Sequence, residues 1–180
     1  MRYCLFYIIF FTYGIVNARN ELHFVNEYID FSVKENYFTV NGVYVFVNTS
    51  SDRRVNEIAF PFALSNDSTE IIRVFNLSQG KQIDYKIYNK SILFKLEIAN
   101  NDTLDVNISY RQLLKKENSY ILLSTAYWNS PLENAVYSFT MNGINTNYSF
   151  SYKPDTLIDN TYYWERINFM PDKDFKVWLK

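Results

Sequence analysis

The stretch YFTVNGVYVFV, Tyr37–Val47, decides the fold class. Its side chains alternate between two faces with a period of two residues, which is the period of a β-strand. Tyr, Phe, Val and Thr are also the residue types that suit a pleated, half-buried surface. The stretch therefore predicts a long β-strand with two different faces.

The rest of the chain repeats this pattern in shorter runs. Aromatic residues make up 19% of the 180 residues, whereas Gly and Pro occur only four times each. Further strands are expected at Ile71–Leu77, Gln82–Tyr88, Ser91–Ile98, Thr103–Tyr110, Ser119–Trp128, Asn134–Met141, Ile144–Tyr152, Thr161–Phe169 and Phe175–Leu179. Short strands separated by turns at this spacing are typical of a sandwich or barrel. We therefore expect an all-β, antiparallel β-sandwich of about 10–12 short strands.

Turn and helix signals are unevenly strong. Asn142-Gly143 is the best hairpin signal in the chain. Arg111 to Asn118 has room for about two helical turns, and Asp67 to Glu70 offers a cap for a short helix through Phe75. Against the second helix, Ile71, Ile72 and Val74 are β-branched and favour a strand.

The first 18 residues have the pattern of a secretory signal peptide. Arg2 precedes an apolar run from Cys4 to about Val16, and Ala18 supplies the small residue before a cut. We predict a signal peptide at residues 1–18 and one domain at 19–180, secreted or periplasmic at the cell envelope, with no membrane span after cleavage. The alternative is that the apolar run is retained as a membrane anchor.

Charge argues against some classes of partner. The chain has 18 basic and 19 acidic residues, a formal net charge of −1, and its longest basic run is Lys115-Lys116. Nucleic-acid binding needs a basic footprint that is missing from this sequence. We therefore expect no nucleic-acid partner.

Three segments carry a family resemblance. They are Val40–Asn48, Phe60-Pro61-Phe62 and Ile108-Ser109-Tyr110. Together they resemble the early strands of immunoglobulin-like β-sandwich modules of exported bacterial proteins. No Cys…Trp…Cys framework accompanies them, so an antibody-type domain is excluded. The resemblance implies a fold and a setting but no activity.

Catalytic chemistry has few candidates. The single histidine, His23, lies in an expected strand, and the single cysteine lies in the leader, so neither a Ser-His-Asp nor a Cys-His arrangement is indicated. Paired carboxylates of a glycan hydrolase stay possible, with these candidates: Glu97, Asp105, Glu133 and Glu165. Solvated surface residues are the simpler interpretation of all four. We expect no cofactor.

Asp172 and Asp174 are the candidates for a metal site. Their D-x-D spacing offers oxygen ligands to Ca²⁺, which takes six to eight oxygens. A turn is the favoured interpretation, because Lys173 separates the two carboxylates.

Two aromatic clusters are the candidates for ligand binding. Tyr127 and Trp128 precede Pro131, which cannot donate to a strand ladder, so they are expected to end a strand. Tyr163 and Trp164 form a similar cluster nearer the C-terminus. Exposed aromatic rings can stack on sugars or anchor a protein, whereas buried ones are core or edge cover.

The sequence as a whole predicts an exported, non-catalytic β-sandwich that acts as a binding or assembly module at the cell envelope. Its partner would be an envelope protein or a polysaccharide. The alternatives are a carboxylate-dependent glycan hydrolase and a structural accessory subunit of an envelope complex.

Overall fold

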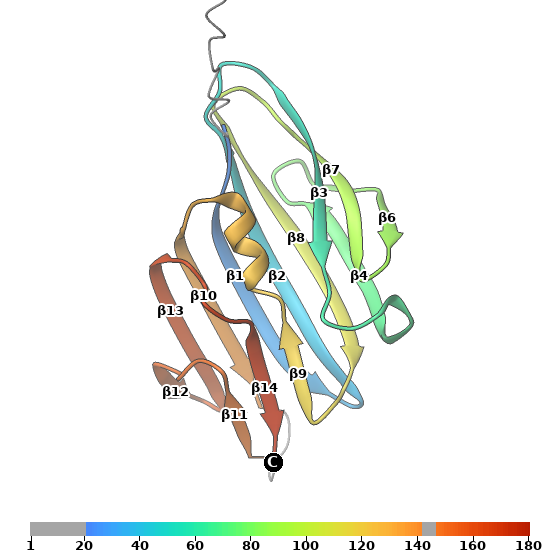
Figure 1. Ribbon diagram of the computed structural model, residues 1–180, viewed down its shortest axis with the longest axis vertical. Helices are drawn as coiled ribbons and strands as arrows, with labels where there is room; N and C mark the ends of the chain where they lie inside the picture. Colours follow the sequence, from blue (N-terminus) through green and yellow to red (C-terminus); the bar gives the residue numbers. More distant parts are fainter. Residues whose placement is uncertain (1–20, 142–146) are drawn as a thin grey trace, which may run out of the picture.

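The structure is a computed structural model that describes residues 21–141 and 147–180. Within these ranges the chain forms fourteen β-strands and two short 3₁₀ helices, so the all-β prediction is confirmed. Figure 1 shows one long, twisted sheet with shorter strands lying across one of its faces. The expected leader at 1–18 and the expected Asn142-Gly143 hairpin lie outside the described residues.

Eight strands form the large sheet, in the order β12-β13-β10-β1-β2-β8-β4-β5. Along the chain these are β1 (Leu22–Lys34), β2 (Tyr37–Asn48), β4 (Thr69–Asn76), β5 (Lys81–Gln82), β8 (Asp102–Leu113), β10 (Leu132–Thr140), β12 (Thr156–Ile158) and β13 (Thr161–Phe169). The β1–β10 ladder is parallel and the other ladders of this sheet are antiparallel. The sheet is therefore mixed, and the prediction of a purely antiparallel fold is wrong at its centre.

Two three-stranded sheets cover one face of the large sheet (Figure 1). One has the order β3-β7-β6, with β3 (Arg54–Pro61), β7 (Ser91–Ile98) and β6 (Tyr85–Tyr88). The other has the order β11-β14-β9, with β11 (Tyr148–Phe150), β14 (Phe175–Leu179) and β9 (Glu117–Tyr120). The 3₁₀ helices are η1 (Asn66–Ser68) and η2 (Leu123–Trp128), and η2 lies on the same covered face, against β1.

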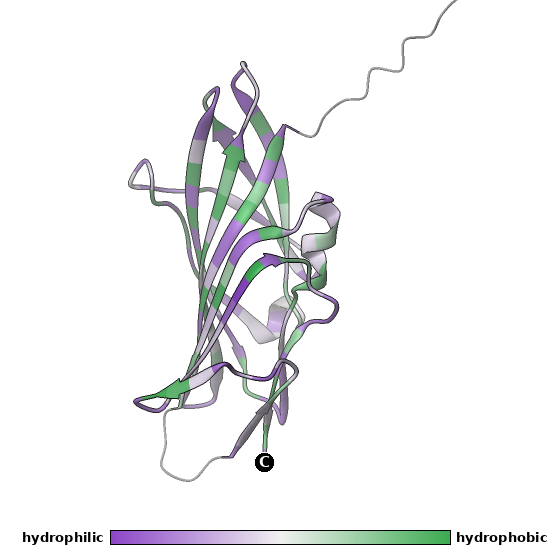
Figure 2. Ribbon diagram, turned by 90° about the vertical axis from the view of Figure 1, so that its left-hand side faces the viewer, coloured by the Kyte–Doolittle hydropathy of each residue, from purple (hydrophilic) through white to green (hydrophobic). Residues whose placement is uncertain are grey.

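Alternation along the strands creates the covered face. In β2, Phe38, Val40, Tyr44 and Phe46 are buried at every second position together with Gly42, and the odd-numbered residues from Tyr37 to Val47 are more exposed. Figure 2 shows the same alternation as hydrophobic and hydrophilic bands along the large sheet. Because successive side chains point to opposite faces, one face of the sheet is apolar and must be covered.

Two local predictions from the sequence are wrong. Residues Arg111 to Asn118 form no helix, because β8 extends to Leu113 and β9 begins at Glu117. The expected strand Ser119–Trp128 ends at Tyr120 and gives way to η2. The strand interpretation of residues 71–75 is confirmed, because β4 begins at Thr69 directly after η1. Among the described residues, no helix has the length and apolarity that crossing a bilayer requires.

Candidate functional site: a cavity between η2 and the large sheet

A cavity of about 380 Å³ lies on the covered face of the large sheet, between η2 and the edge strand β3. Phe24 and Phe46 form its inner wall, Ile58 and Phe60 of β3 face them, and Trp128 closes one side. The volume falls within the usual range for small-molecule pockets. The exposed residues Asn56, Glu57, Ala59 and Tyr127 also line the cavity, so it opens to solvent between β3 and η2.

A distant aspartate fixes the start of η2, and the residue that follows the helix fixes its end. The Asp174 Oδ1 accepts hydrogen bonds from the backbone N–H groups of Leu122 and Leu123, both at 3.0 Å. These donors at the start of a helix have no partner within it, so a carboxylate there acts as a cap. At the other end, Asn129 adopts a left-handed φ of 55° and its N–H bonds to the Ala126 carbonyl oxygen at 3.1 Å. The turn of η2 therefore places Trp128 against the cavity.

Tyr127 and Trp128 both line the cavity but in different ways. The half-buried Trp128 indole lies 5.9 Å from the Phe24 ring and 5.5 Å from the Phe46 ring, measured between centroids. Tyr127 is 87% exposed and forms part of the rim. The sequence predicted both residues at the end of a strand, whereas they lie at the end of η2. Their role in ligand binding stays a prediction.

Tyr163 and Trp164 do not belong to this cavity. Trp164 is 1% exposed, and its indole N–H donates to the Tyr152 carbonyl oxygen at 3.0 Å. Of the two interpretations, exposed recognition ring or core residue, the core interpretation applies to Trp164, because its position in β13 is buried. Tyr163 faces the opposite side of the large sheet and is 37% exposed.

The two aspartates proposed for Ca²⁺ have partners within the chain. Asp174 caps η2, and Asp172 Oδ1 accepts a hydrogen bond from the Tyr152 hydroxyl at 3.1 Å. Residues 21–141 and 147–180 contain no group of three or more His, Cys, Asp or Glu side chains arranged to hold a metal ion. The turn interpretation accounts for both residues.

Glu27 is the functional candidate that sequence reasoning missed. It lies in β1, is 1% exposed and lines the inner end of the cavity. The Tyr137 hydroxyl donates to its Oε1, and the Tyr120 hydroxyl donates to its Oε2 at 3.1 Å. The Tyr44 hydroxyl lies 3.2 Å from that of Tyr120. Since a hydroxyl has one proton, Tyr120 can donate to Glu27 while Tyr44 donates to Tyr120.

Burial controls the ionisation of this cluster. It raises the pKa of Glu27 to about 7, although the hydrogen bonds from Tyr137 and Tyr120 oppose the shift. Burial also raises the pKa values of Tyr44, Tyr120 and Tyr137 well above their usual 10, so all three keep their protons at neutral pH. None of the ion pairs in the described part of the chain involves Glu27. Among the described residues, the hydroxyl dipoles of Tyr120 and Tyr137 stabilise its negative charge.

A signal for Glu27 was present in the alternation of β1. Counting back by twos from Val33 through Phe31 and Ile29 reaches Glu27 on the buried face. The pattern is then hidden, because the register shifts between Phe24 and Asn26. A carboxylate at a position of the apolar face was therefore the sequence signal for a buried polar group in β1.

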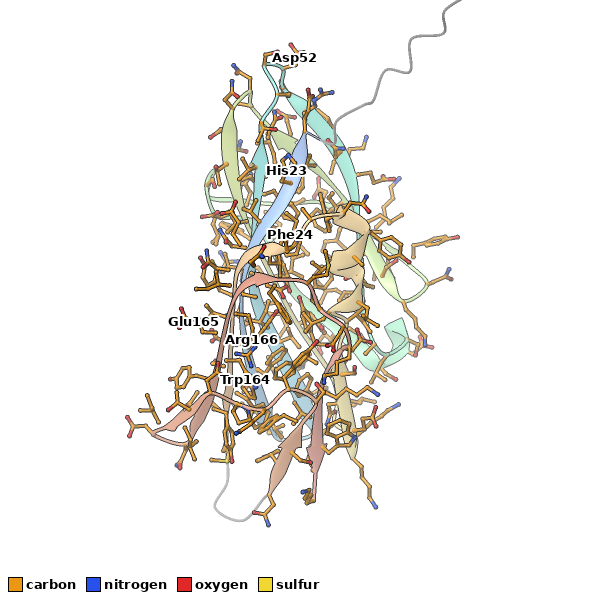
Figure 3. All side chains as sticks on the ribbon, turned by 60° about the vertical axis from the view of Figure 1, so that its left-hand side comes forward. His23, Phe24, Asp52, Trp164, Glu165 and Arg166 are labelled. Carbon is orange, nitrogen blue, oxygen red and sulfur yellow. The ribbon has the colours of Figure 1, made fainter. Side chains whose placement is uncertain are left out.

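The carboxylates proposed from sequence do not form a site in this cavity. Glu97, Glu133 and Glu165 are exposed, Glu97 pairs with Arg53, and Asp105 is half-buried in β8. None of the four lines the cavity. Figure 3 shows Glu165 on the opposite side of the large sheet from η2. His23 is half-buried and contacts the Thr49 hydroxyl at 3.4 Å.

Solved structures share this fold. The chain superposes on a proposed nutrient binding protein from Legionella pneumophila with a TM-score of 0.67 and 17% identity, covering 88% of this chain and 67% of that one. Leukotriene A4 hydrolase from Saccharomyces cerevisiae gives 0.58 and 12% identity, over 88% of this chain and 29% of the enzyme. An M1 zinc metallopeptidase from Deinococcus radiodurans gives 0.53 and 8%, over 89% and 43%.

These likenesses concern the fold alone, because the identities are low and the chain spans less than half of either enzyme. No family model and no curated protein matches the sequence. Nothing in these matches bears on the immunoglobulin-like resemblance, which stays a prediction.

Proposed function

We propose that this chain is a non-catalytic binding module, exported to the cell envelope, that holds a small ligand in the cavity between η2 and β3. The observation that carries the proposal is an open cavity of about 380 Å³ that ends on a buried polar cluster. Protein interiors are otherwise close-packed, so a cavity with aromatic walls and a few convergent polar groups is the usual form of a ligand site.

Three further observations support parts of the proposal. The N-terminal pattern of Arg2, an apolar run and Ala18 supports export. The name of the Legionella pneumophila protein that shares the fold is compatible with a binding role. Both oxygens of Glu27 are engaged by tyrosine hydroxyls, which suits a fixed recognition group better than an acid that must exchange protons with a substrate.

Filling the cavity from η2 tests the proposal. Ser124 lines the cavity, whereas its neighbour Leu123 is exposed and does not. Ser124→Trp should occupy the cavity, and Leu123→Trp adds the same side chain to the same helix outside it. A panel of small aromatic and aliphatic compounds with positive, neutral and negative charge would be screened against wild type and both variants by ligand-observed NMR.

Binding that persists in Leu123→Trp and is lost in Ser124→Trp would support a ligand site in the cavity. Circular dichroism and thermal melting would establish that both variants are folded. If no compound binds wild type, or if both variants bind as wild type does, the proposal fails. Polysaccharides would be screened in the same way, and a response to them alone, unchanged in Ser124→Trp, would place recognition elsewhere on the surface.

A further inference from the structure

The charged side chains that line the cavity are all acidic. Its lining includes two carboxylates, Glu27 at the inner end and Glu57 at the rim. None of the described residues that line it is Lys, Arg or His. An anionic ligand would therefore meet only like charge, which disfavours its binding, whereas a cation would meet an uncompensated carboxylate.

Glu27 has acceptor capacity left for a ligand. A carboxylate offers about four lone-pair positions, and the two tyrosine hydroxyls bound to Glu27 occupy one on each oxygen. A ligand N–H donor that reaches this end of the cavity can take a remaining position. Such a charge-assisted hydrogen bond is about twice as strong as one between neutral groups.

The walls suit the rest of such a ligand. The rings of Phe24, Phe46 and Trp128 lie within 6 Å of one another, with Phe24 and Phe46 stacked at 5.3 Å. Across the cavity, Phe60 meets Tyr44 edge to face at 5.2 Å. Aromatic faces bury apolar groups and also attract cations through their ring quadrupoles.

We propose that the cavity selects small organic cations, with an ammonium group at Glu27 and an apolar body against Phe24, Phe46 and Trp128. This inference rests on the proposed function, because it names the ligand class of the same site. A primary amine with an aromatic or branched aliphatic body has the size and the two chemical halves that this cavity offers.

The inference also predicts a pH dependence. Glu27 is faced by Tyr44 of β2, Tyr120 of β9 and Tyr137 of β10, and these hydroxyls keep their protons throughout the neutral range. Glu57, the other acid of the lining, is exposed at the rim. Because the pKa of Glu27 lies at about 7, affinity for a cation should increase between pH 6 and pH 8 as this carboxyl ionises.

Three probes with one scaffold test the inference: 2-phenylethylamine as the cation, 2-phenylethanol as the neutral isostere and 3-phenylpropanoate as the anion. Isothermal titration at pH 8 would compare wild type, Glu27→Gln and Glu165→Gln. The last variant removes the same formal charge from an exposed position outside the cavity. In wild type and Glu165→Gln, the amine should bind about tenfold more tightly than the alcohol. In Glu27→Gln this preference should disappear.

The outcomes separate the two proposals. Equal affinities for amine and alcohol in wild type, both lost in Ser124→Trp, would overturn the cation inference and leave the cavity as a ligand site. Binding of none of the probes would overturn the cation inference, and binding that Ser124→Trp leaves unchanged would overturn both proposals. If Glu27→Gln does not fold, the amine-to-alcohol preference of wild type at pH 5.5 and pH 8 decides instead. A preference that does not fall at pH 5.5 would contradict a role for Glu27.

Discussion

The two small sheets cover the same face of the large sheet but pack on it differently. Under β11-β14-β9, the ring of Phe175 stacks on Phe31 at 4.5 Å and meets Trp164 edge to face at 5.0 Å. Near β3, η2 takes the place of a further strand, and a cavity of about 380 Å³ is left. The comparison teaches that the strands β11-β14-β9 fill the space above their part of the sheet with stacked rings, whereas η2 beside the edge strand β3 leaves a cavity.

Glu27 lies where the two regions meet. Its partner Tyr120 also contacts Phe31 in the closely packed region, at 5.5 Å between ring centroids. On the other side, Tyr44 of the same hydrogen-bonded chain lines the cavity. The polar cluster thus joins a region that provides stability to a region that has space for a ligand.

The largest effect is expected in the closely packed region. Phe175→Ala removes a fully buried ring that stacks on Phe31, and it should lower the free energy of unfolding by about 3–5 kcal/mol. Urea denaturation followed by circular dichroism would measure the change. If Phe175→Ala lowered the free energy of unfolding by less than Trp128→Ala does, the cavity region would contribute more to stability than the closely packed region.

Ionisation of Glu27 should cost stability as pH rises. Below pH 4.5 the carboxyl is protonated in both the folded and the unfolded chain, so it has no effect. Between pH 4.5 and about 7 only the unfolded chain loses the proton, so the free energy of unfolding falls with pH, by about 3 kcal/mol when complete. The difference between wild type and Glu27→Gln, measured by urea denaturation from pH 4 to pH 8.5, isolates this contribution. Parallel pH profiles would show that Glu27 ionises normally.

Gly42 of β2 has no space for a side chain. A Cβ atom there would come within 2.6 Å of the Tyr44 ring carbon Cζ and 2.7 Å of the Ile29 Cδ1. Tyr44 is buried and cannot move freely, so Gly42→Ala should destabilise the fold by about 1–3 kcal/mol. Thermal melting measures the loss, and the exposed Gly80→Ala, with open space around it but a φ of +64°, reports the cost of backbone strain alone.

The smallest effect on stability is expected in the cavity region. Trp128 is half-buried and borders existing space, so Trp128→Ala should cost only about 1–2 kcal/mol. The same change should weaken binding of any compound that Ser124→Trp excludes. Thermal melting and ligand-observed NMR on one preparation would test both statements. Unchanged binding would remove Trp128 from the site.

The sequence predicted what depends on local pattern. Alternation located β2, and the strands expected at Thr161–Phe169 and Phe175–Leu179 agree with β13 and β14. The parallel pairing of β1 with β10 was not predicted, because the pairing of two strands depends on the whole fold and not on the sequence of either strand. The end of β9 at Tyr120 was not predicted, because the cap that starts η2 comes from Asp174, which is distant in sequence.

Of the residues that line the candidate cavity, the sequence singled out only Tyr127 and Trp128. It did so because two adjacent aromatic residues precede a proline, which predicted the end of a strand there. Glu27 was not found, because its partners Tyr120 and Tyr137 come from strands about a hundred residues further along the chain. A buried carboxylate is explained only by partners that the sequence does not place beside it.

From the parallel β1–β10 ladder we also expect an order of events during folding. Asn26 and Asn134, which are 108 residues apart in sequence, are joined by a side-chain hydrogen bond at this ladder. Closing so long a loop costs more conformational entropy than pairing β1 with β2 through a tight turn. The β1–β2 hairpin should therefore form early and keep an open edge until β10 adds to it. As a ribosome extends the chain, that edge is exposed to other strands for the time needed to translate about a hundred residues.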